Sequence, residues 1–419
     1  MIGSLDPRKK KVSIVGAGIS GLLAGHELKK RGFDVQIFEA SSRVGGLLQT
    51  RKTFFGPSEK AAHSILVTPE VQKFFEELGV PLLPVAPKSK ARFIVRNRKM
   101  RRMPLTPTEA IQTAVRVFSK PKVALSPSAS LADWCDIYLG MPARRYLLSP
   151  FVTGIFACTP EELNAKISFP KLVPTDPRLS LFRWVKRKPR HARRSRPQVM
   201  APEQGMQSVI DALAERLQNE IHLNSPIEKL NLESDVNLIL TVPAPALSSL
   251  IESSDPRSAL ALKQVRYSPL VSVTAFYREE DFQNGPPNGI GVLIPRDEGY
   301  RILGCLFNSS AFPSRAQKGF VSLTAMVGGS TDPDAIQLND DEVGTLIDRE
   351  LRSLLNTRKG PAHVEIARWP QAIPVYSNEL KAAQEALQKG FCATPGQLIF
   401  SNFSKEVSIR GMIETLLKL

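Results

Sequence analysis

The chain has 419 residues, which is more than one ordinary hydrophobic core supports, so two or more domains are expected. Apolar residues make up 42% and charged residues 23%, a balance that is typical of folded globular proteins and excludes extensive disorder. The net charge of +16 leaves anionic surfaces as candidate partners. The four scattered cysteines argue against a zinc site and against a disulfide scaffold.

The first residues are basic, and no apolar run precedes Val12, so we expect no signal peptide. No stretch approaches the roughly 20 uncharged apolar residues that a membrane-spanning helix needs. These features and the absence of a C-x-x-C pair predict a cytoplasmic chain. A peripheral contact with the inner face of the cell membrane stays open.

The first regular elements follow the order strand, helix, strand. Lys11–Val15 and Val35–Glu39 are short β-branched runs, and Gly21–Lys30 between them is typical of a helix that ends near Gly32. Parallel strands need a crossover connection of this kind, so the order predicts a parallel sheet in an α/β fold. The expected architecture is a doubly wound dinucleotide-binding domain.

A glycine-rich turn joins the first strand to this helix. Gly16 permits the tight turn, Gly18 lets the backbone approach a pyrophosphate, and Gly21 allows close packing of helix on strand. Glu39 ends the second strand, where a carboxylate accepts hydrogen bonds from ribose hydroxyls and disfavours a 2′-phosphate. The residues predicted to contact the dinucleotide here are Gly16, Ala17, Gly18, Ile19, Ser20, Gly21, Glu39 and Ala40.

Further along the chain, Thr68 can cap a helix that Gly79 ends. Residues 105–196 are rich in Pro, Ser and Arg, with short helical patterns. Apolar residues at helical spacing follow Met206, and several alternating strands between residues 268 and 330 predict a second sheet. We therefore divide the chain into a discontinuous dinucleotide-binding domain (1–68, 197–254 and 360–419), a substrate domain with a mixed sheet (69–90 and 255–359) and a mostly helical insertion (91–196).

The segment Arg183–Arg196 carries eight basic residues among fourteen. It is interpreted first as a solvated loop, with an anionic membrane as the alternative. No aromatic interleaving and no nucleic-acid motif accompany the run, so no nucleic-acid partner is predicted.

After Glu39 the chain continues with Arg43, Gly45 and Gly46. This R-x-G-G segment resembles the flavoprotein fold shared by amine oxidases, phytoene desaturases and protoporphyrinogen oxidases. The resemblance implies that the cofactor is FAD and that its pyrophosphate continues along Arg43, Gly45, Gly46 and Leu47.

Longer segments resemble the protoporphyrinogen oxidase family and keep its order along nearly the whole chain. They are residues 92–104, 152–163, 238–251, 289–316, 369–376 and, more weakly, 401–414. The resemblance implies oxidation of protoporphyrinogen IX, or of coproporphyrinogen III, to the porphyrin in haem biosynthesis. It also implies molecular oxygen as the electron acceptor, and a homodimer stays open.

The same resemblance implies site residues. Arg92 would meet a substrate propionate, Phe93 would line the slot beside it, Gly154 would lie near substrate and flavin, and Leu293 would press on the macrocycle. The flavin would be contacted by Ala61, Ala62, His63, Ser64, Trp369, Val407, Ser408 and Ile409, and its adenine by Ile227 in a strand after the Met206 helix. No general base is nominated, because no His/Asp/Glu constellation is visible.

The sequence departs from the family at several positions. Glu379 and Leu380 stand where a Gly-His pair is usual, Cys158 replaces a glycine, and the C-terminal motif around Gly411 is altered. These departures keep two alternatives open. One is a flavin amine oxidase or carotenoid-desaturase-like oxidoreductase, and the other is a degenerate flavin-binding protein without catalysis.

Overall fold

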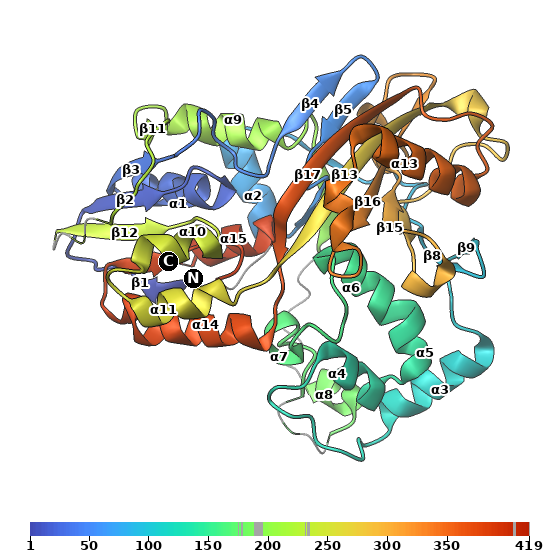
Figure 1. Cartoon of the computed structure of the whole chain (residues 1–419), viewed down its shortest axis with the longest axis horizontal. Coiled ribbons are helices and arrows are strands. Elements are labelled where there is room, and N and C mark those ends of the chain that lie inside the picture. Colours follow the sequence, from blue (N-terminus) through green and yellow to red (C-terminus); the bar gives the residue numbers. More distant parts are fainter. Residues whose placement is uncertain are drawn as a thin grey trace.

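The computed structural model describes residues 1–174, 176, 179–187, 196–230, 232, 235–404 and 408–418. Figure 1 shows a sheet with helices on both faces, a second sheet beside it, and a group of short helices below the second sheet. The architecture is α/β, as the sequence predicts, with a doubly wound sheet, a second mixed sheet and a helical insertion.

Within the described residues, the doubly wound sheet has the strand order β1-β18-β12-β2-β3-β11. Neighbouring strands are parallel, except that β1 runs antiparallel to β18. The strands are β1 (Ile2–Ser4), β2 (Lys11–Val15), β3 (Asp34–Phe38), β11 (Ile221–His222), β12 (Val236–Leu240) and β18 (Gln397–Ile399). The switch in strand order beside β2 leaves its carboxyl end free for a ligand.

Helices cover both faces of this sheet because successive strand residues point to opposite sides. Val12 and Ile14 pack on one face with α1 (Ile19–Lys30), α2 (Pro69–Leu78), α9 (Gln207–Arg216) and α15 (Ile409–Leu416). Leu238 and Leu240 pack on the other face with α10 (Ala244–Ile251), α11 (Pro256–Lys263) and α14 (Asn378–Lys389).

The second sheet has the order β17-β13-β16-β15-β14-β8-β9 across the described residues. Its neighbours are antiparallel, apart from the parallel pair β14 and β8. The strands are β8 (Arg92–Arg96), β9 (Lys99–Arg101), β13 (Tyr267–Arg278), β14 (Gly291–Leu293), β15 (Ile302–Leu306), β16 (Phe320–Gly328) and β17 (His363–Pro374). One face packs on α13 (Asp340–Leu355); we call the opposite face, which meets the helical insertion, the inner face.

Two smaller sheets and several short turns connect these layers. The strands are β4 (Thr50–Thr53) with β5 (Gly56–Glu59), and β6 (Ile65–Val67), β7 (Leu82–Pro84) and β10 (Gln198–Pro202). The short helical turns are η2 (Glu279–Asp281), η3 (Arg296–Glu298), α12 (Asn308–Ala311), η4 (Pro313–Arg315), η5 (Pro333–Gln337) and η6 (Phe391–Ala393).

The helical insertion lies against the inner face of the second sheet. Its elements are α3 (Pro107–Phe118), α4 (Leu131–Tyr138), α5 (Met141–Ala143), the π-helical turn η1 (Arg144–Leu148), α6 (Ser149–Phe156), α7 (Ala165–Ser168) and α8 (Leu181–Arg187). Thr106 and Ser130 form capping boxes that start α3 and α4. Among the described helices, none combines the length and the apolar composition that crossing a membrane requires.

Some segments pack away from the domain in which the sequence places them. Helix α2 was expected in the substrate domain, but Phe74 and Phe75 lie in the core of the doubly wound sheet. Strand β17 was expected in the dinucleotide-binding domain, but it pairs with β13 of the second sheet. Strands β8 and β9, at the start of the expected insertion, also belong to that sheet.

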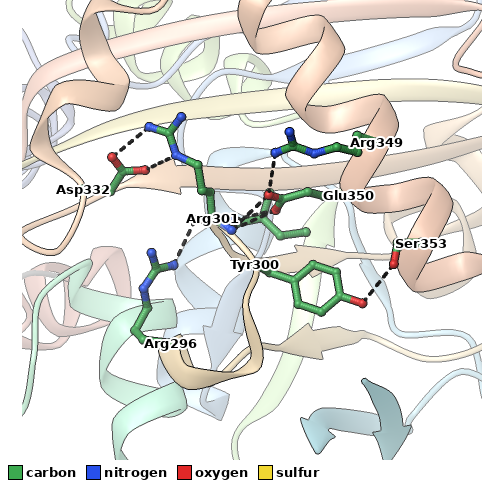
Figure 2. A network of polar contacts seen from close by, with 8 residues as sticks. Arg296, Tyr300, Arg301, Asp332, Arg349, Glu350 and Ser353 are labelled. Carbon is green, nitrogen blue, oxygen red and sulfur yellow. Dashed lines mark hydrogen bonds and ion pairs between the residues drawn. The ribbon is translucent and has the colours of Figure 1, made fainter. Parts of the chain in front are cut away.

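A buried carboxylate anchors α13 to the second sheet, as Figure 2 shows. Glu350 on α13 is 5% exposed and accepts hydrogen bonds from the N–H groups of Arg301 and Ile302 (3.0 and 2.9 Å). The guanidinium of Arg301 in turn forms two hydrogen bonds with Asp332 (2.8 and 2.9 Å). This network fixes the start of β15, and hence the register of the inner face.

Candidate functional site

The glycine turn after β2 has the expected backbone shape. Gly16 has φ +103°, a left-handed value that suits glycine, and its N–H donates to Phe38 O on β3 at 2.8 Å. Helix α1 starts at Ile19 with Gly18 as its N-cap, and no side chain caps its first turn. The N–H groups of that turn, which include those of Ser20 and Gly21, are placed to bind an anion.

Gly18 and Gly21 border different surroundings. An ideal Cβ at Gly21 would lie 1.9 Å from Gly16 O, so this glycine is required by packing within the protein. An ideal Cβ at Gly18 would meet only Gly46 Cα, at an ordinary 3.9 Å. The side of Gly18 is therefore open toward a ligand, and the cradle fits a dinucleotide pyrophosphate.

Glu39 lies directly beside the glycine turn. Its carboxylate accepts hydrogen bonds from Ala17 N (2.8 Å) and from Ser41 N (2.9 Å) and Oγ (2.8 Å). These bonds hold the acid at the carboxyl end of β3, next to the exposed Ala40. The carboxylate retains lone pairs that can accept hydrogen bonds from ribose hydroxyls, and this role stays a prediction.

The R-x-G-G segment folds back against the glycine turn. Gly45 N donates to Ala17 O at 2.8 Å, and an ideal Cβ on Gly46 would lie 3.2 Å from Gly18 Cα. Gly45 and Gly46 have φ values of +102° and +57°, which explains the glycine pair. Arg43 donates to the carbonyl oxygens of Val44 and Gly46, and Leu47 is 37% exposed beside them.

The inner face of the second sheet brings together three of the four predicted substrate residues. Arg92 pairs with Gly291, and Ile94 pairs with Leu293, so Arg92 and Leu293 point to the same side of the sheet. Gly154 on α6 packs on Leu293, because an ideal Cβ at Gly154 would lie 2.4 Å from Leu293 Cδ2. Trp369 belongs to the same face through its pairing with Leu270.

The expected position of Phe93 is wrong. Strand alternation turns Phe93 away from Arg92, and its half-buried ring packs against the core on the opposite face of the sheet, 6.4 Å from the ring centroid of Phe307. Phe93 therefore does not line a slot on the inner face.

Comparison with known proteins decides the family. Residues 19–390 match the family described as flavin containing amine oxidoreductase, which is most of the chain. The chain belongs to this family. FAD is accordingly its cofactor, and the chain is a flavin-dependent oxidoreductase, in agreement with the open side of Gly18 and the dinucleotide cradle.

The named relatives act on porphyrinogens. Protoporphyrinogen oxidase 2 of Arabidopsis thaliana is 28% identical, over 96% of this chain and 91% of the relative. Coproporphyrinogen III oxidase of Bacillus subtilis (strain 168) is 24% identical, over 91% of this chain and 92% of the relative. A crystal structure from Exiguobacterium sp. 255-15, provisionally named a protoporphyrinogen oxidase, shares the fold with a TM-score of 0.75 and 20% identity, covering 99% of this chain and 100% of that one. The resemblance read from the sequence is confirmed.

The segment predicted to pass the flavin ring is tied to the inner face. Trp369 Nε1 donates to Lys60 O at 2.8 Å, which fixes the start of the run Ala61, Ala62, His63 and Ser64. Ala61 and Ala62 pack on the core of the doubly wound sheet, whereas His63 and Ser64 line a cavity against the second sheet. Burial, and then the charge of Arg315, lowers the pKa of His63 to about 3, so its imidazole is neutral.

The C-terminal residues of the predicted flavin site lie beside the glycine turn. Ser408 caps α15 by accepting a hydrogen bond from Gly411 N at 3.1 Å, and Ile409 packs on the same core as α1. Ser20 Oγ on α1 lies 3.5 Å from Met412 Sδ, which joins the two helices. Val407 lies outside the described residues.

Ile227 does not lie in a strand. The expected strand ends at His222, because β11 contains only Ile221–His222, and Ile227 follows in an irregular segment. This segment still runs beside the nucleotide site, since Ser225 N donates to Glu39 O at 2.9 Å.

The sequence analysis did not single out Thr241. Its Oγ1 donates to Val15 O and Gly16 O (2.8 and 3.0 Å) and would lie 2.7 Å from a Cβ on Gly16. Thr241 thus supports the glycine turn from the carboxyl end of β12. Thr241 directly follows a predicted strand of the parallel sheet, and ligands of such sheets bind at the carboxyl ends of the strands, so this position could have identified it from the sequence.

Proposed function

We propose that the chain oxidises a porphyrinogen to a porphyrin in haem biosynthesis, and of the two candidate substrates we favour protoporphyrinogen IX over coproporphyrinogen III. The observation that carries the proposal is the similarity to protoporphyrinogen oxidase 2 of Arabidopsis thaliana along 96% of this chain. The inner face supports it, because apolar Ile94 and Leu293 lie beside the Arg92 cation on one surface. A macrocycle with carboxylate arms calls for this combination of apolar wall and cation.

Some residues of the chain would bind the substrate, and others would exclude water from it. FAD, when bound, supplies the hydride acceptor. Arg92 would hold a propionate at the edge of the sheet, while Leu293 and Trp369 would exclude water from the inner face. Molecular oxygen as the final electron acceptor, and a homodimer, remain predictions of the same proposal.

The test is anaerobic addition of porphyrinogen to the purified FAD-loaded protein. We expect bleaching of the flavin absorbance, followed in air by the fluorescence of porphyrin. Arg92→Ala should raise KM at least tenfold with FAD occupancy unchanged, whereas Lys90→Ala, two residues earlier and exposed, serves as the matched control. An unchanged KM in Arg92→Ala would remove Arg92 from the substrate site.

Two alternatives predict different results in the same assay. In a flavin amine oxidase or a carotenoid-desaturase-like enzyme, the flavin would stay oxidised when porphyrinogen is added. Its absorbance would bleach when an amine or a polyene is added. A degenerate flavin-binding protein would bleach with none of these compounds. The altered C-terminal motif around Gly411 is the feature that favours this last alternative.

We further propose that the helical insertion contacts the cytoplasmic surface of the cell membrane. Ile111, Val115 and Phe118 follow helical spacing on α3 and are 65%, 59% and 61% exposed. The ring of Phe118 lies 4.6 Å from that of Phe182 on α8, which extends the apolar surface. The exposed cations Arg101, Lys120 and Lys122 flank α3 in the chain. An apolar helix face bordered by cations suits an anionic lipid surface.

Cosedimentation with vesicles tests this proposal. The wild-type protein should bind vesicles that contain phosphatidylglycerol and should bind pure phosphatidylcholine much less. Val115→Glu should lower the bound fraction at least fivefold, whereas Gln112→Glu places the same charge at another exposed position of α3 and should not. Equal binding of both variants would exclude α3 from the contact. The basic residues 188–195 lie outside the described residues.

A further inference from the structure

An ion pair between Glu59 and Arg315 is buried where the second sheet meets the doubly wound domain. Arg315 Nη1 lies 3.3 Å from Glu59 Oε1, and the two side chains are 4% and 2% exposed. Glu59 ends β5, whereas Arg315 ends η4 beyond the strands β14 and β15 of the second sheet. The pair therefore joins segments that lie far apart in the sequence.

Burial works against both charges of this pair. Loss of hydration raises the pKa of the Glu59 carboxyl and lowers that of the Arg315 guanidinium, each only partly opposed by the partner's charge. Replacing such a pair by apolar side chains of similar volume is often neutral or stabilising. Stability alone is thus a weak reason for the pair, and a geometric role is the better explanation.

The remaining contacts of the pair fix several segments at once. Glu59 Oε2 accepts from Thr50 Oγ1 (2.7 Å), and Glu59 Oε1 accepts from Met206 N at the start of α9 (2.9 Å). Arg315 Nη2 donates to Pro202 O on β10 (2.9 Å). One carboxylate and one guanidinium thereby set the positions of β4, β10, α9 and η4 relative to one another.

Two routes lead from the pair to the cofactor cradle. Through α9, Ile210 packs directly on Gly45, since an ideal Cβ at Gly45 would lie 3.0 Å from Ile210 Cγ2. Through the chain itself, Lys60 follows Glu59 and its carbonyl oxygen accepts the indole N–H of Trp369. Both halves of the FAD site thus depend on where Glu59 lies.

A third contact reaches the run predicted to pass the flavin ring. Glu59, Arg315 and His63 line the same cavity of about 30 Å³, together with Ser64 and Asn308. His63 Nε2 and Arg315 Nη1 have no hydrogen-bond partner among the described residues. Arg315 and His63 thus border one small cavity, and the charge of Arg315 contributes to the lowered pKa of His63.

We propose that Glu59 and Arg315 are positioning residues, whose ion pair holds the second sheet and the cofactor cradle in the arrangement that binds FAD. The inference requires only that the chain binds FAD, and so it does not depend on porphyrinogen oxidation. It predicts that the pair contributes to FAD affinity more than to the stability of the fold.

The test compares two double variants. Glu59→Leu with Arg315→Met removes both buried charges, and we expect the FAD dissociation constant to rise at least tenfold while the thermal midpoint of the apo-protein stays within about 3 °C of wild type. The visible circular dichroism of the bound flavin should also change. The control is Glu252→Leu with Lys263→Met, which removes the exposed ion pair at 2.7 Å and should alter neither quantity.

Glu59→Gln provides a second measurement that keeps the side-chain shape. Its amide oxygen can still accept from Met206 N, so the variant should fold and still raise the FAD dissociation constant severalfold. Wild-type affinity in both Glu59 variants would overturn the proposal. The proposal would also be overturned if Glu59→Leu with Arg315→Met lost FAD affinity only in proportion to a fall in the thermal midpoint of the apo-protein. Failure to oxidise porphyrinogen with normal FAD affinity would count against the proposed function alone.

Discussion

Two alanine substitutions in the glycine turn can separate a loss of FAD binding from a loss of folding stability. Gly18→Ala and Gly21→Ala add the same methyl group three residues apart in one helix turn. At Gly18 the nearest heavy atom to the new Cβ is Gly46 Cα at 3.9 Å, and the backbone angles (φ −68°, ψ 176°) suit any residue. At Gly21 the new Cβ would lie 1.9 Å from Gly16 O, which side-chain rotation cannot relieve.

The expected magnitudes follow from these distances. Alanine is a poorer N-cap than glycine, so the apo-form of Gly18→Ala should lose up to about 1 kcal/mol of stability. A methyl group in the pyrophosphate position displaces about two charge-assisted hydrogen bonds of roughly 1.5 kcal/mol each. The FAD dissociation constant should then rise about 100-fold, since each 1.4 kcal/mol is a factor of ten. Gly21→Ala should cost about 3 kcal/mol or more before any cofactor is added.

Fluorescence quenching of FAD on titration with apo-protein measures the affinity, and thermal melts with and without FAD measure the two stabilities. Wild type should gain stability with FAD, as linkage requires for a ligand that binds the folded state. The apo-form of Gly18→Ala should melt close to the wild-type apo-protein, and its gain in stability with excess FAD should be about 2.7 kcal/mol smaller than that of wild type, as a 100-fold weaker affinity requires. If Gly18→Ala binds FAD within threefold of wild type, the assignment of the pyrophosphate to this turn is refuted.

Other predictions test single structural statements. Phe93→Leu should lower the thermal midpoint, because the lost packing costs about 1 kcal/mol of unfolding free energy, and it should leave KM unchanged. Gly79→Ala should cost about 1 kcal/mol in urea unfolding, because φ is +78° but no atom obstructs the new methyl. Arg98→Gly, at φ +59° in the β8–β9 turn, should instead raise the thermal midpoint. The hydrogen bond from Arg96 lowers the pKa of Glu109 from 4.5 to about 2, so its stabilisation is complete above pH 4.5 and lost as pH falls toward 2; wild type and Glu109→Gln should therefore differ in thermal midpoint at pH 6 and converge near pH 2.

The local elements were predictable because short-range rules determine them. Thr68 accepts from Val71 N and Gly79 adopts the left-handed conformation, as the capping pattern around α2 predicts. The first strand and the glycine turn likewise follow from spacing within thirty residues. What these patterns do not contain is the layer to which an element belongs, and so α2 was assigned to the wrong domain.

The positions of Arg92 and Phe93 illustrate a second limit. A resemblance places both residues near a substrate, but adjacent strand residues point to opposite faces. The sequence around β8 is basic on both sides, so its charge pattern does not identify the buried face. The pairing of β8 with β14, which lies almost 200 residues later in the chain, decides that Arg92 shares a face with Leu293.

The Glu59–Arg315 pair carried no sequence signal at all. A lone carboxylate at a strand end and an arginine among many are most often solvated, and their separation hides the contact until the second sheet folds onto the first domain. The consequence concerns more than prediction. Because the same carboxylate meets Arg315, Thr50 and the start of α9, the cradle that holds FAD is completed only when both domains are in place. Loss of the Glu59–Arg315 pair in the full chain should therefore leave the glycine turn in place and weaken the binding of FAD.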